Sequence, residues 1–261
     1  KTTLKDADII FKIQRLMTSK DKIDEISMCK KDAMVISHMS ALSSKTDIEE
    51  YAKASITTFA MDLMPRISRA QSMDVLSSQS NLSGYQAVIK GANNFNSAFP
   101  MMMTAAGTVA PAKVFIMGVG VAGLQAIATA KRMGAIVTAY DVRAATKEQV
   151  ESLGGKFLIV DEEAMKEAET SGGYAKEMTE EYKKKEQEVI KNHIKDQDIV
   201  ITTALIPGRP APKLVTKEMV NSMRTGSVIV DLAVETGGNC ELAKRNEVVD
   251  ADGVKIVGYD N

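Results

Sequence analysis

Three glycines with the spacing of a phosphate-binding turn follow an apolar segment in the middle of the chain. Residues 113–117 are KVFIM, and Gly118, Gly120 and Gly123 come directly after them in the pattern GxGxxG. Residues 124–133 continue with the pattern of a helix. An isolated GxGxxG is a weak signal, but between a strand and a helix it predicts a dinucleotide-binding turn.

Each glycine of this turn has a separate physical task. Gly118 permits the tight turn, Gly120 lets a pyrophosphate approach the backbone, and Gly123 lets the helix pack closely on the strand. The phosphates then face the helix N-terminus, where unpaired N–H groups favour negative charge. Asp141 lies eighteen residues beyond Gly123, where a carboxylate accepts hydrogen bonds from the adenosine ribose. The sequence therefore predicts NAD(H) as the ligand.

Arg143 supports the opposite cofactor. An arginine just after this strand binds the 2′-phosphate of NADP(H), whereas the carboxylate of Asp141 repels it. We give Asp141 the greater weight because it occupies the expected position. A glycine turn with a purely structural use is the remaining alternative, and a strand, a helix and an acid in the right order disfavour it.

A polar segment before the turn offers further candidate groups. Arg66, Gln71, Asp74 and Ser77 place a guanidinium, an amide, a carboxylate and a hydroxyl within twelve residues. Such a set fits a ligand site and, equally well, a helix cap with a solvated face. Composition alone does not separate these alternatives.

Histidine and loop chemistry have few candidates. We expect His193, in a lysine-rich helical segment, to lie at the surface. His38 follows an apolar strand, and we expect it to be structural, because a single histidine without a named partner is a weak catalytic candidate. Tyr174 follows two glycines, and a flexible loop there either places its ring over a nucleotide or forms an exposed turn.

The elements that position these residues alternate between strands and helices. Strands are predicted at 7–12, 33–37 and 55–60, with a helix from Asp47 before the last of them. A further helix is predicted at 84–93. The apolar strands that follow are 114–117, 136–140, 157–160, 199–203, 228–232 and 254–257. Six such strands, with helical segments between most of them, indicate a doubly wound parallel sheet.

We therefore expect an α/β protein with two Rossmann-like lobes, each with a parallel sheet, and a nucleotide in the cleft between them. Residues 1–103 form a companion lobe with a linking helix and lack its N-terminal part, and 104–261 form the NAD(H)-binding lobe. The charged connection 161–198 predicts two helices with a mobile loop between them. The three methionines at 101–103 are predicted to fill the core.

Composition limits the class of protein. Hydrophobic residues make up 44% of the chain, charged residues 26%, and the net charge is −1, which is typical of a globular protein and gives no sign of a nucleic-acid binder. No apolar run approaches the roughly 20 residues of a membrane-spanning helix. Cys29 and Cys240 lack the paired spacing of a zinc site, so no metal site is predicted.

Seven segments together resemble one family. They are RISRAQSMD (66–74), MMMTAAG (101–107), GVGVAGL (118–124), DVRAATK (141–147), GGYAKEM (172–178), TALIPGRP (203–210) and DLAVETGGN (231–239). In this order they closely resemble the NAD(H)-binding component, domain I of the alpha-subunit type, of proton-translocating NAD(P) transhydrogenases, which are related to alanine dehydrogenases. The resemblance extends over almost the whole chain.

The resemblance implies which residues contact the cofactor. Around the nicotinamide it places Arg66, Ile67, Ser68, Gln71, Ser72, Met73, Asp74 and Ser77. Around the pyrophosphate and adenosine it places Gly118, Val119, Gly120, Val121, Gly123, Asp141, Val142 and Arg143. A mobile loop and an apolar contact correspond to Gly173, Tyr174 and Leu205. Glu186 stands where a glutamine is expected, and this cofactor contact departs from the family pattern.

The resemblance also implies a reaction, which is direct hydride transfer between NADH bound here and NADP⁺ on a partner domain. Arg66, Gln71, Asp74 and Ser77 would be the catalytic residues. Because the hydride moves directly between the rings, their task is orientation and exclusion of water. The implied partners are an NADP(H)-binding domain, a membrane domain that couples transfer to proton translocation, and a second copy in a homodimer. The implied location is the soluble face, cytoplasmic or matrix, of an energy-transducing inner membrane.

Two other functions share these features. In an alanine dehydrogenase, Lys12 and His38 would contact pyruvate, although the sequence after Lys12 and the segment 66–74 argue against this. In a non-catalytic NADH sensor, cofactor binding would move the loop 172–178. Turnover with a partner domain distinguishes the sensor from the transhydrogenase.

Overall fold

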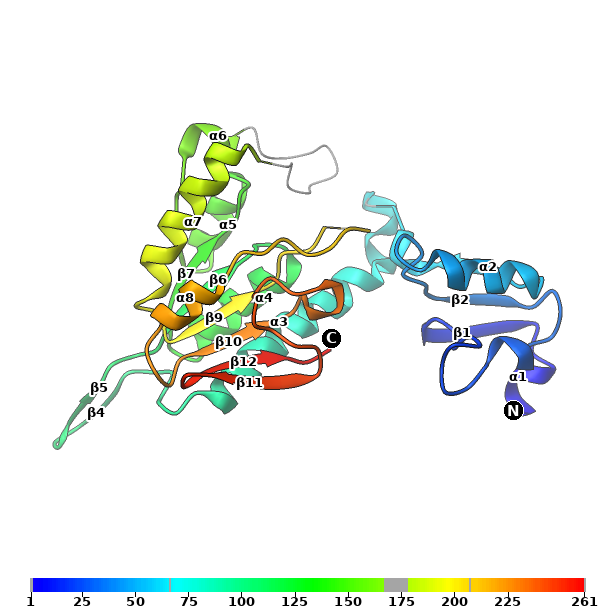
Figure 1. The fold of residues 1–261 in the computed structure, drawn as a ribbon, viewed down its shortest axis with the longest axis horizontal. Coiled ribbons are helices and arrows are strands. Elements are labelled where there is room, and N and C mark those ends of the chain that lie inside the picture. Colours follow the sequence, from blue (N-terminus) through cyan, green and yellow to red (C-terminus); the bar gives the residue numbers. More distant parts are fainter. Residues whose placement is uncertain (1, 66, 167–177, 207, 261) are drawn as a thin grey trace. The chain divides into compact units, whose positions relative to one another are not determined.

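Two compact units, Lys1–Ser78 and Gln79–Asn261, make up the chain in a computed structural model (Figure 1). The structure describes all residues except 1, 66, 167–177, 207 and 261. The division falls inside helix α3 (Val75–Asn94). The sequence-based division at 103/104 assigns this entire helix to the first lobe.

The first unit contains a three-stranded parallel sheet of order β1-β2-β3. Its elements are α1 (Thr2–Lys5), β1 (Ile9–Gln14), β2 (Met34–His38), α2 (Lys45–Lys53), β3 (Thr57–Ala60) and three short 3₁₀ helices at Ile26–Met28, Met61–Leu63 and Ser68–Met73. The three predicted strands are confirmed with shifted ends. Leu16, Val35, Met39 and Tyr51 are fully buried and form the centre of the core.

The other face of this sheet is apolar and exposed. Ile9, Phe11 and Ile13 of β1 and Phe59 of β3 are all at least half exposed, whereas Ile10 is buried. Alternate residues of a strand point to opposite faces, so the three exposed side chains of β1 share one face. Among the described residues, only the opposite face of the sheet carries a core.

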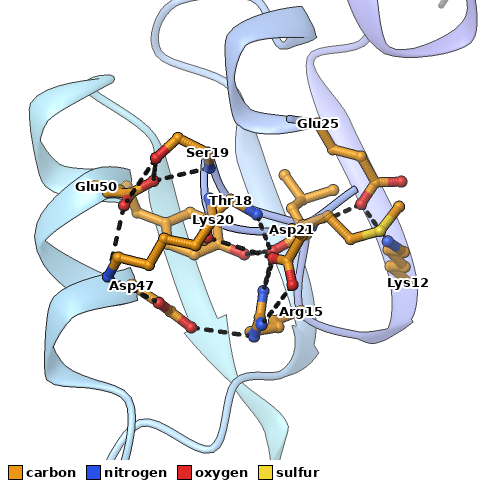
Figure 2. Close-up of polar contacts among 12 residues, drawn as sticks. Lys12, Arg15, Thr18, Ser19, Lys20, Asp21, Glu25, Asp47 and Glu50 are labelled. Atoms are coloured by element: carbon orange, nitrogen blue, oxygen red, sulfur yellow. Dashed lines mark hydrogen bonds and ion pairs between the residues drawn. The ribbon is translucent and has the colours of Figure 1, made fainter. Parts of the chain in front are cut away.

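Charged side chains hold the connection after β1 to α2 (Figure 2). Arg15 donates from Nη1 to Oδ2 of Asp21 at 2.8 Å, and its Nε lies 3.1 Å from Oδ2 of Asp47. The backbone N–H of Ser19 donates to Oε2 of Glu50 at 3.1 Å. Partly exposed ion pairs contribute little individually, but together these bonds fix the path of the connection.

The second unit contains a seven-stranded sheet of order β11-β12-β10-β9-β6-β7-β8. The strands are β6 (Lys113–Met117), β7 (Ile136–Tyr140), β8 (Lys156–Phe157), β9 (Ile199–Thr202), β10 (Val228–Asp231), β11 (Glu247–Ala251) and β12 (Val254–Gly258). Only β11 is antiparallel to its neighbour. In chain order the other six are arranged 3-2-1-4-5-6, so the predicted doubly wound parallel sheet is confirmed.

Helices cover both faces of this sheet. One face packs against α3, α4 (Val121–Arg132) and α5 (Thr146–Ser152), and the other against α6 (Glu162–Lys166), α7 (Glu180–Ile194) and α8 (Lys217–Ser222). Successive residues of β6 alternate between the two cores. Val114 and Ile116 join the first, and Phe115 and Met117 join the second. Burial on both faces explains the uninterrupted apolar sequence of this strand.

The prediction that the methionines at 101–103 fill the core is wrong. Met101 is 57%, Met102 54% and Met103 72% exposed. They lie at a hairpin of β4 (Met102–Thr104) and β5 (Gly107–Val109), which projects away from the seven-stranded sheet (Figure 1). Apolar composition alone does not reveal whether a segment turns toward a core or away from it.

The prediction that His193 lies at the surface is also wrong. Its Nε2 lies 2.8 Å from the hydroxyl of Thr138, and its ring packs edge-on against Phe115 at 4.7 Å. Burial lowers the pKa of His193. The two helices predicted within 161–198 are confirmed as α6 and α7, and the loop predicted between them falls at 167–177, outside the described residues.

Candidate nucleotide-binding site

The strand order places one special position in the second unit. β6 and β9 are neighbours and parallel, and the sheet runs from β6 toward β8 on one side and from β9 toward β12 on the other. In open α/β sheets, ligands bind beyond the carboxyl ends of the strands at such a reversal of order. Gly118 follows β6 here, and Thr203 follows β9.

The glycines of the turn have the geometry that their predicted tasks require. Gly118 has φ +98°, and Gly123 packs so closely that a Cβ there would lie 1.9 Å from the carbonyl oxygen of Gly118. Gly120 is the N-cap of α4, and a Cβ on it would meet no atom within 4 Å among the described residues. Two glycines therefore close the turn, and the third leaves open space at the start of a helix.

Asp141 fixes the turn from the end of β7. Its Oδ2 accepts the backbone N–H of Val119 at 2.8 Å and Nη2 of Arg143 at 2.8 Å. Its Oδ1 accepts the backbone N–H of Arg143 at 2.9 Å and Nε at 2.8 Å. The side chain of Asp141 is buried. Hydrogen bonds to a charged group are among the strongest in proteins, so the carboxylate is held rigidly beside the glycines.

The same geometry addresses the opposing signal from Arg143. The guanidinium binds both oxygens of Asp141, and Nη2 lies 3.2 Å from the carbonyl oxygen of Val119. A 2′-phosphate would have to compete with this carboxylate for the arginine while lying next to it. The arrangement therefore favours a ribose with free hydroxyls, as in NAD(H).

The remaining residues of the turn differ in exposure. Val119 is buried in the core, so a nucleotide would meet only backbone at this position. Val121 is exposed, and Val142 is half-buried. Leu205 follows β9 and is also exposed. The structure therefore brings 118–123, 141–143 and Leu205 to the carboxyl edge of one sheet.

The polar segment 67–77 belongs to the first unit. Asp74 accepts the backbone N–H of Ser77 at 2.9 Å and its hydroxyl at 2.6 Å, so it caps the first turn of α3. Gln71 is exposed, as are Ile67, Ser68, Ser72 and Met73. A hollow of about 180 Å³ is lined by Pro65, Ile67, Ala70, Gln71 and Asp74. The segment combines a helix cap with an open, polar hollow.

Three predicted site residues, Arg66, Gly173 and Tyr174, lie outside the described residues. Glu186 is described, and its Oε1 accepts the hydroxyl of Tyr140 at 2.5 Å. Tyr182 lies 3.1 Å from the same hydroxyl. Burial raises the pKa of Glu186 and raises that of Tyr182 to about 12. Glu186 is therefore tied to the last residue of β7.

The residues of the alanine dehydrogenase alternative are found in the first unit. Lys12 forms an ion pair with Glu25, which also accepts the backbone N–H of Met17 at 2.8 Å (Figure 2). His38 ends β2, and its Nε2 is buried without a hydrogen-bond partner in the described part of the chain. The ammonium of Lys12 is therefore already neutralised by a carboxylate.

Two site residues escaped the sequence-based selection, although both lie inside the motifs that carry the family resemblance. Thr203 donates its hydroxyl to the carbonyl oxygen of Gly118 at 2.9 Å. Asn239 binds the backbone of Ala204, which follows β9, through its side-chain amide. Their partners lie 85 and 35 residues away in the chain, so only the folded topology identifies them.

Comparisons with known proteins give the family. Residues 1–83 match the family model "Alanine dehydrogenase/PNT, N-terminal domain", and 87–261 match "Alanine dehydrogenase/PNT, C-terminal domain". The chain is 62% identical over 258 residues to an NAD(P) transhydrogenase subunit alpha chain of Rhodospirillum rubrum, covering 99% of this chain and 67% of that protein. An alanine dehydrogenase of Mycolicibacterium smegmatis is 28% identical over 228 residues, covering 85% of this chain and 55% of the relative.

A solved structure gives the same result. The transhydrogenase of Sinorhizobium meliloti superposes with a TM-score of 0.85 at 55% identity, covering 98% of this chain and 67% of that one. In the described part of this chain, no helix is long and apolar enough to cross a membrane. With both family models matched and the glycine turn in place, the chain belongs to the alanine dehydrogenase/PNT family and, within it, to the alpha-subunit type of NAD(P) transhydrogenase.

Proposed function

We propose that this chain binds NADH at the carboxyl edge of β6, β7 and β9 for direct hydride transfer to NADP⁺ on a partner domain. The observation that carries the proposal is the glycine turn fixed by Asp141 at the reversal of strand order. The open space at Gly120 and the first N–H groups of α4 fit a pyrophosphate. Asp141 is in position for the adenosine ribose.

The segment 66–77 orients the nicotinamide in this proposal. The hydride leaves C4 of NADH with its electron pair and joins C4 of NADP⁺, so no proton donor is needed. Arg66, Gln71, Asp74 and Ser77 contribute by holding the ring and its carboxamide in one orientation. Exposed groups around the hollow at Gln71 support this role.

The partners follow from the same proposal. They are an NADP(H)-binding domain and a membrane domain that couples hydride transfer to proton translocation. The relative from Rhodospirillum rubrum carries the name of a subunit, which supports assembly with other chains. We place the chain at the cytoplasmic or matrix face of an energy-transducing inner membrane.

A second copy of the chain is the remaining partner, and the β4–β5 hairpin is its proposed contact. No charged side chain occurs in 91–112, although 26% of the whole chain is charged. Every residue in 100–110 is exposed. An isolated two-stranded hairpin is marginally stable, and permanent homodimer interfaces are apolar and poor in charge.

Substitution in this hairpin tests the homodimer. Met102→Glu combined with Met103→Glu should convert the dimer to a monomer in sedimentation velocity, because two buried charges would oppose association. Val248→Glu, which adds a charge at an exposed position of β11, is the matched control. An unchanged dimer in the hairpin variant would exclude this surface.

Turnover tests the function. NADH oxidation is followed with an NADP⁺-loaded partner domain in one cuvette and with pyruvate plus ammonium in another. We expect oxidation only with the partner domain. Oxidation with pyruvate and ammonium would establish an alanine dehydrogenase instead, and NADH binding without turnover in either cuvette would favour a sensor.

A further inference from the structure

The segment after β9 forms one wall of the position where the strand order reverses. Its first residue, Thr203, binds the carbonyl oxygen of Gly118, and a Cβ on Gly118 would lie only 2.7 Å from Oγ1 of Thr203. Leu205 and Ile206, which follow, are exposed although they are apolar. The segment lies outside any helix or strand, so something other than regular structure must hold it at the glycine turn.

The side chain of Asn239 provides that support. Its Oδ1 accepts the backbone N–H of Ala204 at 3.0 Å, and its Nδ2 donates to the carbonyl oxygens of Ala204 at 2.9 Å and Pro212 at 2.8 Å. Two acceptors face Nδ2 and one donor faces Oδ1, so the amide has a single satisfactory orientation. Asn239 is fully buried, and its amide binds both backbone groups of Ala204 as a neighbouring strand would.

The backbone of Asn239 is itself fixed. Its carbonyl oxygen accepts the N–H groups of Leu214 at 2.8 Å and Val215 at 3.0 Å. The buried carboxylate of Asp231, at the end of β10, accepts the N–H of Cys240 at 2.8 Å. A Cβ on Gly238 would lie 2.8 Å from the same carboxylate. The turn that carries Asn239 therefore has little freedom, and the amide is aimed at one place.

We propose that Asn239 is a positioning residue for the nicotinamide half of bound NADH. It acts through Ala204, which it holds so that Leu205 stays against the ligand beside the glycine turn. This inference rests on the proposed function. In a doubly wound sheet the dinucleotide lies across the reversal of order. Asp141 marks the adenosine half over β6 and β7, so the segment after β9 lies on the side of the other half.

The test uses two ligands that differ in that half. The full chain and its Asn239→Ala variant are titrated by calorimetry with NADH and with 5′-AMP. Losing three hydrogen bonds frees the segment, and we expect the Kd for NADH to rise about tenfold. The Kd for AMP should change by less than about twofold, because the contacts at Asp141 are untouched. Asn221→Ala, at an exposed position of α8, is the matched control.

A purely structural role would give a different pattern. Partial unfolding lowers the number of binding sites and leaves both Kd values unchanged, and a general loosening of the sheet weakens both ligands equally. Either result overturns the proposal. Leu205→Ala covers the case in which Asn239→Ala does not fold, because it should reproduce the selective loss of NADH affinity without touching the buried amide.

The same titrations separate this inference from the proposed function. If the unaltered chain binds no NADH, the proposed function fails. If it binds NADH and neither variant is selective, only the role of Asn239 fails.

Discussion

The glycine turn and the segment 67–77 are both candidate cofactor sites, yet they are built in opposite ways. At the turn, a buried carboxylate with four donors holds the backbone, and two glycines leave no room for a side chain. In 67–77, most side chains are exposed, and Asp74 serves the helix that follows. A preformed site pays its ordering cost during folding and so favours affinity. Exposed groups are suited to orienting a ligand that is already held.

Gly123→Val should break the preformed side with the largest effect. The new side chain would begin 1.9 Å from the carbonyl oxygen of Gly118, so α4 and β6 must separate. We expect a loss of at least about 3 kcal/mol in the free energy of unfolding, with NADH binding lost as well. Denaturant unfolding and NADH titration measure the two effects. Ala128→Val, at a half-buried position of the same helix, should cost far less.

Gln71→Ala should separate orientation from affinity on the open side. We expect hydride transfer to NADP⁺ to slow about 100-fold, because a small misplacement of the ring is costly to transfer. The Kd for NADH should stay within about threefold. Single-turnover kinetics beside equilibrium titration give both numbers. Equal losses in rate and affinity would mean that Gln71 is an anchor, and the contrast between the two regions would disappear.

Gly120→Ala should affect the ligand but not the fold. A Cβ at Gly120 meets nothing within 4 Å among the described residues, so the free energy of unfolding should change by less than about 1 kcal/mol. The methyl group would occupy the space proposed for the pyrophosphate, and we expect NADH affinity to fall at least about tenfold. An unchanged affinity would place the phosphates elsewhere.

His193 lies in neither region and should affect only stability. Burial lowers its pKa below the ordinary 6.5, Asp196 opposes this shift, and Lys113 adds to it. The unfolded chain therefore binds the proton more readily. This contribution to stability is complete above pH 6.5 and is lost as the pH falls below it. In His193→Asn, thermal unfolding between pH 7 and 5 should depend less steeply on pH, with the Kd for NADH unchanged. An equally steep dependence would contradict the assignment.

Local patterns in the sequence were sufficient for much of this fold. The continuous apolar strands, the glycine spacing and the alternation of strands and helices predicted the doubly wound sheet. β11 was missed because its sequence, EVVDA, alternates weakly at an exposed edge. The hairpin at 102–109 was missed because its methionines resemble core residues in composition. His193 was misplaced because lysines on one side of α7 concealed the side that packs on the sheet.

The candidate site divides along the same line. The structural tasks of Gly118 and Gly123 follow from spacing, and the geometry confirms them. The pairing of Arg143 with Asp141 depends on how one side chain folds back, which spacing does not encode. The support from Asn239 depends on contacts between distant segments. Sequence therefore indicates which residues meet a ligand more readily than which residues hold them in place.

The strand order also determines when the site is completed during synthesis. β6 has β7 and β9 as its neighbours, and β9 begins only at Ile199, so one edge of the apolar strand VFIM stays unpaired while the intervening segment leaves the ribosome. Unpaired edges of this kind invite association between nascent chains. The contact between Thr203 and Gly118 closes that edge, so a protein destined to bind a nucleotide acquires its binding wall and its protection from aggregation in the same late step.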